Sequence, residues 1–422
     1  MSFPDIRRRS RKWLSVEEIR FLILLLIFVL AMLALNLYLA RTLPGGEWLY
    51  LRWSGARAFL IEKIEPYGTE ISQRVQETVY GRVATENEYP FVLNDPFHIV
   101  LLYTPLALFS DFTLARAIWM LLSEAALVGI ILQAIDLSEW QPPRWLYILL
   151  IGLGLFSYFS LQALVSNSPT IFLTFLYLAI ILALRAHSDE LAGALLFLVA
   201  YQWEVGALFF LYILVLVFAN RRWGVLTGFG MSLVVALVIS FLVYPGWGLP
   251  YVRAVLSDWY RGANINLNSI AAAWFPDSRF SVGAITSIVV GVIVFIEMVS
   301  STQSHFRRIV WTVCLSLAAT PLLGFAIFPS NHVALIPALI LILALVWERW
   351  TRHRAFATLL VLGIAILVPF GIYFRNPMLS DRLYSDLLSA LPPIATIRAL
   401  YWMRWWVLHS PRTWSDQIGL HR

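Results

Sequence analysis

The sequence has a single cysteine and a small share of charged residues. Cys314 is the only cysteine in 422 residues, which excludes an intrachain disulfide and a cysteine-based metal site. Asp, Glu, Lys and Arg together make up 13% of the chain, against about 25% in an ordinary soluble domain. Hydrophobic residues make up 60%, and a soluble protein of that composition would expose large apolar patches to water. The composition therefore predicts an integral membrane protein.

Common catalytic motifs are missing as well. The sequence contains no HExxH zinc motif, no P-loop, no GxGxxG fingerprint and no GxSxG elbow. This disfavours the common hydrolases and nucleotide-dependent pumps, and we expect no cofactor; a divalent metal would have no recognisable ligand motif. The net charge of +6 comes from short basic clusters between apolar runs. That pattern orients helices in a bilayer, so no nucleic-acid partner is expected.

The apolar runs predict an all-α polytopic membrane protein with eleven spans in one domain, 1–422. Each run is expected to be helical, because backbone groups facing lipid must form their hydrogen bonds internally. The predicted spans are 21–40, 97–110, 114–136, 146–165, 170–185, 191–219, 224–243, 282–299, 309–328, 332–348 and 355–374. The C-terminal segment, 375–422, contains a Trp-rich apolar stretch at 394–408. That stretch is expected to be an interfacial helix on the outer face or a short twelfth span.

Basic clusters orient the predicted spans. Five Lys or Arg residues within 7–12 place the N-terminus inside, since cytoplasmic loops carry the Lys/Arg excess. The run 97–110 is short for a span, but counting it as a crossing places the later basic clusters at 221–222, 307–308 and 349–354 inside too. Two long loops, 41–97 and 244–281, then lie outside. The first is expected to carry short amphipathic helices at 52–61 and 70–84.

A few acidic residues occupy positions where a carboxylate has a function. Glu124, Glu204 and Glu297 fall inside predicted spans, where an acid is a functional candidate by default. Glu297 is near a span end and is expected to pair or snorkel, whereas Glu204 lies in the middle of the sixth predicted span. Glu47 and Asp95 stand at the two ends of the first outer loop. Partial burial at the membrane surface would raise a carboxylate's pKa towards the range of a general base.

An ordered set of short motifs resembles a known family. The set comprises Glu47, Gly55-Ala56-Arg57-Ala58, Pro66-Tyr67, Tyr103-Thr104-Pro105, Leu114-Ala115-Arg116-Ala117 with Trp119, Ala192-Gly193, Arg221-Arg222-Trp223, Asn266 to Ser269 and Asn331-His332. In this order the chain resembles the polyprenyl-phosphate-sugar-dependent glycosyltransferases of the GT-C superfamily, and among them glycosyltransferase family 87. It departs from the family in four places: Glu47 replaces the usual Asp, 166–169 replaces Gly-Gln, 202–204 replaces a lysine, and an insertion separates Pro66 from Asp95.

The resemblance implies transfer of a sugar, mannose or another hexose, from a polyprenyl-phosphate-sugar donor to a lipid or glycan acceptor. The reaction would invert the anomeric centre at the outer face of a bacterial plasma membrane, within a GT-C-like bundle. Glu47 is the predicted catalytic base, with Asp95 as the second candidate. The predicted donor-phosphate ligands are Arg52, Arg57, Arg253, Arg261 and His332, and the predicted substrate contacts are Trp48, Tyr67, Tyr103, Asn266, Asn268 and Glu204.

Two other classes of protein remain open from the sequence. A transporter or lipid flippase would carry acids and broken helices near the membrane midplane, and Glu204 is its best residue. A non-catalytic glycolipid-binding relative would account for the missing lysine and Gly-Gln.

Overall fold

The computed structural model describes residues 16–85, 88–261, 265–277, 281–376 and 382–409, and every regular element within these ranges is a helix. Eight of these helices are long and apolar enough to cross a membrane, or nine if the pair α7 (Arg144–Phe156) and α8 (Tyr158–Val165), bent by 45°, forms one span. The eight are α1 (Val16–Thr42), α6 (Phe112–Leu137), α11 (Trp203–Asn220), α12 (Trp223–Val243), α15 (Val282–Ser301), α16 (Phe306–Ala319) with η2 (Thr320–Leu323), η3 (Pro329–Leu335) with α17 (Ile336–Arg349), and α18 (Arg354–Arg375). The prediction of an all-α, multi-pass membrane protein is confirmed.

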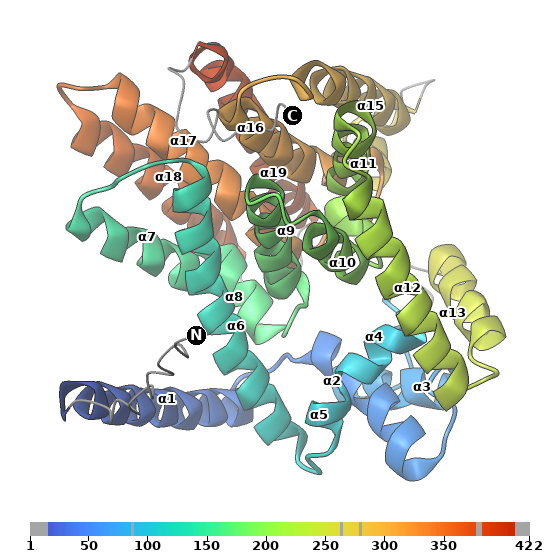
Figure 1. Ribbon diagram of the computed structural model, residues 1–422. Helices are drawn as coiled ribbons and strands as arrows, with labels where there is room; N and C mark the ends of the chain where they lie inside the picture. Colours follow the sequence, from blue (N-terminus) through green and yellow to red (C-terminus); the bar gives the residue numbers. More distant parts are fainter. Residues whose placement is uncertain (1–15, 86–87, 262–264, 278–280, 377–381, 410–422) are drawn as a thin grey trace, which may run out of the picture.

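The bundle is built around α16 and α17, whose side chains are almost all buried, including Trp311 and Leu341. By contrast α1 extends from one side of the bundle (Figure 1) and packs mainly on α6. Asn36 on α1 is fully buried at this contact and donates a hydrogen bond to the Glu124 carboxylate on α6, at 3.0 Å.

In the sequence, α1 is followed by several short helices that precede α6, and these form a layer at the lower edge of Figure 1. It consists of α2 (Glu47–Arg57), the π-helical turn η1 (Ala58–Glu62), α3 (Thr69–Tyr80), α4 (Phe97–Leu102) and α5 (Thr104–Ala107). The layer has its own apolar core, in which Leu49, Ile71 and Phe97 are fully buried. We call it the outer layer.

The predicted span at 97–110 is wrong, because this segment belongs to the outer layer. It forms two helices, α4 and α5, of six and four residues. At about 1.5 Å per residue neither approaches the roughly 30 Å of a bilayer core. The run is apolar because its side chains, Phe97 among them, fill the core of the layer.

The predicted single span at 191–219 is also wrong. It consists of α10 (Asp189–Val199) and α11, joined at 200–202. Arg222, just beyond α11, forms an ion pair with Asp189 at the start of α10. The two helices therefore form a hairpin whose turn lies inside the protein. Because the segment 97–110 does not cross and this hairpin returns to its starting side, the two errors cancel, and Arg221 and Arg222 keep the side that the sequence predicted relative to the start of α1.

The basic clusters of the bundle lie at one of its ends, where they form ion pairs. Arg222 pairs with Asp189, and Arg307 on α16 pairs with Glu348 on α17. Arg185, at the end of α9 (Thr170–Arg185), pairs with Asp136 near the end of α6. The connections after α6 and α9 therefore lie at this basic end. Strict alternation of the predicted spans would have put them at the other end, which is a further correction.

The interfacial assignment of the C-terminal segment is wrong for the part that the structure describes. Helix α19 (Arg382–Leu408) packs against α16, α17 and α18. Leu400 and Met403 are fully buried, and the Trp311 indole donates a hydrogen bond to the Leu400 carbonyl at 2.9 Å. Arg404 pairs with Glu297 at 2.9 Å, so Glu297 has the structural partner that was expected of it. Residues 377–381 and 410–422 lie outside the described ranges.

Candidate functional site

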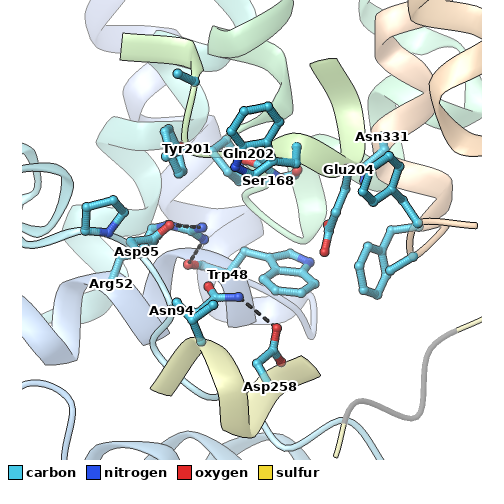
Figure 2. A pocket seen from close by; sticks show the side chains of 18 of the residues that line it. Trp48, Arg52, Asn94, Asp95, Ser168, Tyr201, Gln202, Glu204, Asp258 and Asn331 are labelled. Carbon is cyan, nitrogen blue, oxygen red and sulfur yellow. Dashed lines mark hydrogen bonds and ion pairs between the residues drawn. The ribbon is translucent and has the colours of Figure 1, made fainter. Parts of the chain in front are cut away.

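A cavity of about 800 Å³ lies between the outer layer and the bundle. Its walls come from α2, the segment before α4, the turns before α9 and between α10 and α11, α12, α13 (Gly248–Arg261) and the segment 323–331. Apart from tyrosines and tryptophans, the polar side chains of the lining are Arg52, Asn94, Asp95, His98, Ser168, Gln202, Glu204, Asp258, Asn266 and Asn331. Figure 2 shows ten labelled side chains of this lining, which come from the outer layer, from α13 and from the bundle.

A buried ion pair lies at one side of the cavity. Asp95 receives two contacts from the Arg52 guanidinium, with Nε 2.8 Å from Oδ2 and Nη2 3.0 Å from Oδ1. A third guanidinium N–H donates to the Trp48 carbonyl at 3.0 Å. The two side chains are 5% and 2% exposed, so each compensates a charge that water cannot reach. The pair ties α2 to the segment before α4.

A second carboxylate faces the cavity from α13. Asp258 on α13 accepts hydrogen bonds from the Tyr89 hydroxyl at 3.1 Å and from the Asn94 amide at 2.8 Å. Burial raises the pKa of Asp258, and these two hydrogen bonds offset only part of that rise. The contacts hold α13 against the outer layer.

Glu204 is the third carboxylate of the lining. It lies in the first turn of α11, where the helix dipole favours a negative charge. Within the described ranges its side chain has no hydrogen-bond or ion-pair partner. Figure 2 places it across Trp48 from the Arg52–Asp95 pair. Glu204 is therefore the acid in this cavity that is free to interact with a ligand.

Aromatic rings complete the wall around Trp48. The Trp48 ring centroid lies 5.1 Å from that of Phe328 and 5.5 Å from that of Tyr89. Phe328 comes from the bundle and Tyr89 from the outer layer, so the cluster joins the two parts. Trp48 also faces the cavity, and a fixed indole beside amides and carboxylates suits a polyhydroxylated ligand, which has both apolar C–H faces and hydroxyl groups.

Glu47, the predicted base, is not among the residues that line the cavity, although its neighbour Trp48 is. It begins α2 after Gly45 and Gly46, whose φ values of +116° and +89° require glycine-like freedom. Burial raises the pKa of Glu47 to about 7, against the opposing effects of a backbone hydrogen bond and the charge of Arg116. The environment thus suits a base, but the position does not place Glu47 at the cavity wall.

Of the predicted phosphate ligands, Arg52 alone lines the cavity in the described part of the chain, and Asp95 holds it. Arg57 donates instead to the carbonyls of residues 107 and 109. Arg253 is exposed on α13, and the side chain of Arg261 lies outside the described part. His332 lines a separate apolar cavity of about 310 Å³ between α8, α17, α18 and α19.

The predicted substrate contacts divide in a similar way. Trp48, Glu204 and Asn266 line the cavity. Tyr67 and Tyr103 do not: the Tyr67 hydroxyl donates to the Asp95 carbonyl at 3.0 Å, and Tyr103 is buried behind Arg52. Asn268 is exposed and also lies off the lining.

Sequence reasoning missed several residues of the site. Asp258 was not singled out, because an acid in an amphipathic outer helix is indistinguishable from a solvated one without its tertiary partners. Asn94 and Tyr89 lie outside any helix, and only their hydrogen bonds to Asp258 mark them as part of the site. Asn331 was noted only within the Asn331-His332 resemblance, and there the structure turns Asn331 to the cavity and His332 away from it.

Comparison with known proteins does not extend these observations. No family model, no curated protein and no solved structure matches the chain. Among the residues that the structure describes, no group of three or more His, Cys, Asp or Glu side chains could hold a metal ion.

Proposed function

We propose that this protein transfers a sugar, mannose or another hexose, from a polyprenyl-phosphate-sugar donor to a lipid or glycan acceptor. The observation that carries the proposal is the cavity between the outer layer and the bundle, where carboxylates, amides and an indole meet at the ends of membrane-crossing helices. Such a site takes a hydrophilic sugar beside the bilayer while the lipid part of the substrate remains in the membrane. The proposal includes a GT-C-like arrangement of the bundle, with this site at the outer face of a bacterial plasma membrane.

The reaction requires one base and a place for the leaving phosphate. The acceptor oxygen forms a bond to the anomeric carbon while the bond from that carbon to the phosphate oxygen breaks. The electron pair leaves with the polyprenyl phosphate, and the acceptor proton passes to a carboxylate oxygen. A direct displacement of this kind with a single carboxylate base inverts the anomeric centre.

The lining supports Glu204 as that base. A base must come within about 3 Å of the acceptor hydroxyl, and Glu204 and Asp95 both face the cavity. The Asp95 carboxylate is occupied by Arg52, so it orients α2 rather than taking up a proton. Glu47 remains the prediction that the resemblance supports, and transfer measurements distinguish the three acids.

The test is transfer by the purified protein in nanodiscs with radiolabelled polyprenyl-phosphate mannose and the matching glucose donor. Glu204→Gln is expected to lose about 10²–10⁴-fold in rate while still binding donor. The matched control is Glu124→Gln, which removes a carboxylate that contacts Asn36 away from the cavity. Full activity of all three variants Glu204→Gln, Asp95→Asn and Glu47→Gln would rule out this mechanism.

One observation favours a second candidate, a transporter or lipid flippase. The α10–α11 hairpin ends inside the protein with Glu204 at its turn, and interrupted helices with an acid at the break are typical of transporters. The measurement is movement of a fluorescent lipid-linked sugar across proteoliposome membranes. Movement without chemical change, and without any transfer product, would favour this candidate over the transferase.

A further inference from the structure

One helix end at the cavity is left without a partner. Three helices of eight or more residues have their N-cap in the lining: α9 at Pro169, α11 at Gln202 and α14 (Leu267–Trp274) at Asn266. The first turn of α11 contains Glu204, and α14 is closed by a capping box between Asn266 and Ser269.

Helix α9 has neither feature. Its first turn has no acidic residue and its N-cap, Pro169, forms no side-chain cap. Ser168, one residue earlier, accepts one weak bond from the Thr170 N–H at 3.3 Å. The other first-turn N–H groups have no acceptor within the helix. An uncapped N-terminus with its partial positive charge is a place where an anion binds.

An orphaned amide lies at the same helix end. Asn331, on η3, is 6% exposed and lines the cavity. Its Oδ1 accepts a hydrogen bond from the Thr170 hydroxyl at 2.8 Å, and that hydroxyl accepts one from Ser168 at 3.0 Å. These bonds orient the amide, whose Nδ2 has no partner among the described residues. A buried donor without an acceptor is costly, so this amide is expected to donate to a ligand.

The charges of the lining indicate where in the cavity an anion fits. Among the described side chains that line the cavity, the arginine is Arg52, and its charge is already neutralised by Asp95. Asp258 disfavours an anion at its own side, and Figure 2 shows Ser168 and Asn331 on the side of the cavity away from it. The N-terminus of α11, equivalent to about half a positive charge, compensates the Glu204 carboxylate in part. Donors without acceptors are therefore concentrated at the start of α9.

We propose that the N-terminus of α9 and the amide of Asn331 bind a phosphate group through neutral N–H donors. This site replaces the arginine and histidine ligands that the sequence predicted. The identification of the phosphate as that of the lipid-linked donor rests on the proposed function; the binding of a phosphate anion does not.

The test is equilibrium binding of polyprenyl phosphate, which carries no sugar, to the full-length protein in zwitterionic nanodiscs. Asn331→Asp replaces the donor by a negative charge at the same volume and is expected to weaken binding at least roughly a hundredfold; Asn331→Ala and Thr170→Val are expected to cost about tenfold each. The matched control is Thr174→Val, one turn deeper in α9, where the buried hydroxyl donates only to the Thr170 carbonyl. It should bind as the wild type does.

The outcomes separate this site from the proposed function. Binding that is lost in Asn331→Asp, with no sugar transfer by the wild type, would support the site and contradict the transferase. Inorganic phosphate binding as tightly as polyprenyl phosphate would support the site with free phosphate as its ligand. Unchanged binding in folded Asn331→Asp and Thr170→Val would overturn the site even if transfer is observed, as would equal affinity for uncharged polyprenol.

Discussion

Arg52 and Asp95, 43 residues apart in the sequence, form a buried ion pair with two contacts that joins the first helix of the outer layer to the segment entering α4. The Arg52 guanidinium also donates a hydrogen bond to the Trp48 carbonyl, which fixes the backbone at Trp48. The position of Trp48 and Asp95 in the cavity wall therefore depends on this ion pair within the outer layer, as well as on the packing of the membrane-spanning helices.

Removing one partner of this pair should destabilise the protein strongly. Arg52→Met leaves the Asp95 carboxylate buried without compensation, which costs about 3–5 kcal/mol. The double variant Arg52→Met, Asp95→Asn leaves no buried charge and should recover a large part of that loss. Thermal unfolding of the purified variants in detergent measures both. A single variant as stable as the wild type would mean that the pair is solvated.

Two glycines of α12 should respond differently to the same substitution. A Cβ on Gly228 would lie 2.1 Å from the Glu190 carbonyl oxygen on α10, whereas a Cβ on Gly230 meets nothing within 4 Å. Gly228→Ala is therefore expected to cost about 1–3 kcal/mol by overpacking. Gly230→Ala should be neutral or slightly stabilising, since alanine favours helix. Equal thermal stability of the two variants would contradict the close packing of α10 on α12.

Much of the fold follows from composition, and the errors have identifiable causes. The run 191–219 is apolar throughout apart from residues 202–204, so its length predicts one span, while the break depends on the packing of α10 against α12 and α9. The run 97–110 is apolar because it fills the core of a layer, and composition does not distinguish that core from lipid.

The candidate site was predictable only in part, for a related reason. Glu204 and Asp95 attract attention as acids near or inside apolar runs, and both line the cavity. Asp258 is recognised as a site residue only through its hydrogen bonds with Tyr89 and Asn94, which lie more than 160 residues away in the sequence. No local pattern specifies a contact of that range.

The hairpin formed by α10 and α11 predicts a membrane topology that differs from the one expected from the sequence, and labelling can distinguish the two. Ala186 is exposed between α9 and α10, at the end where Arg185 pairs with Asp136. Alternation of the predicted spans places it outside. The structure places it at the end of the bundle that carries the basic clusters, which the excess of Lys and Arg in cytoplasmic loops puts inside. Cysteine at Ala186 or at exposed Arg352 should resist an impermeant thiol reagent in intact cells, and cysteine at Glu77 should react.

Native Cys314 is buried and should not react with the thiol reagent in this experiment. Labelling at Ala186 together with Glu77 would contradict the hairpin and restore the single span.

Glu47 should make the stability of the protein depend on pH. Its folded pKa of about 7 lies above the ordinary 4.5, so the fold favours the neutral carboxyl. That contribution is complete below about pH 4.5 and is lost as the pH rises through 7, on the order of 1–3 kcal/mol for this partly exposed group. Glu47→Gln stays neutral, so its melting temperature should rise relative to the wild type between pH 5 and pH 8.

The control is Glu77→Gln, which removes an exposed acid from α3 and should follow the wild type at every pH. A Glu47→Gln difference that stays flat across this range would mean that the Glu47 carboxylate is solvated.

The binding of the donor sugar in the cavity between the outer layer and the bundle is tested most directly by photo-crosslinking with a polyprenyl-phosphate sugar that carries a diazirine on the sugar ring. After irradiation of the protein in nanodiscs, peptide mass spectrometry maps the labelled residues, with and without an excess of unmodified donor. We expect label that the excess donor suppresses at Trp48, Tyr201 and Asp258, which line the cavity from three different elements. Label confined to the apolar cavity at His332, or label that excess donor does not suppress, would contradict the assignment of the sugar to this site.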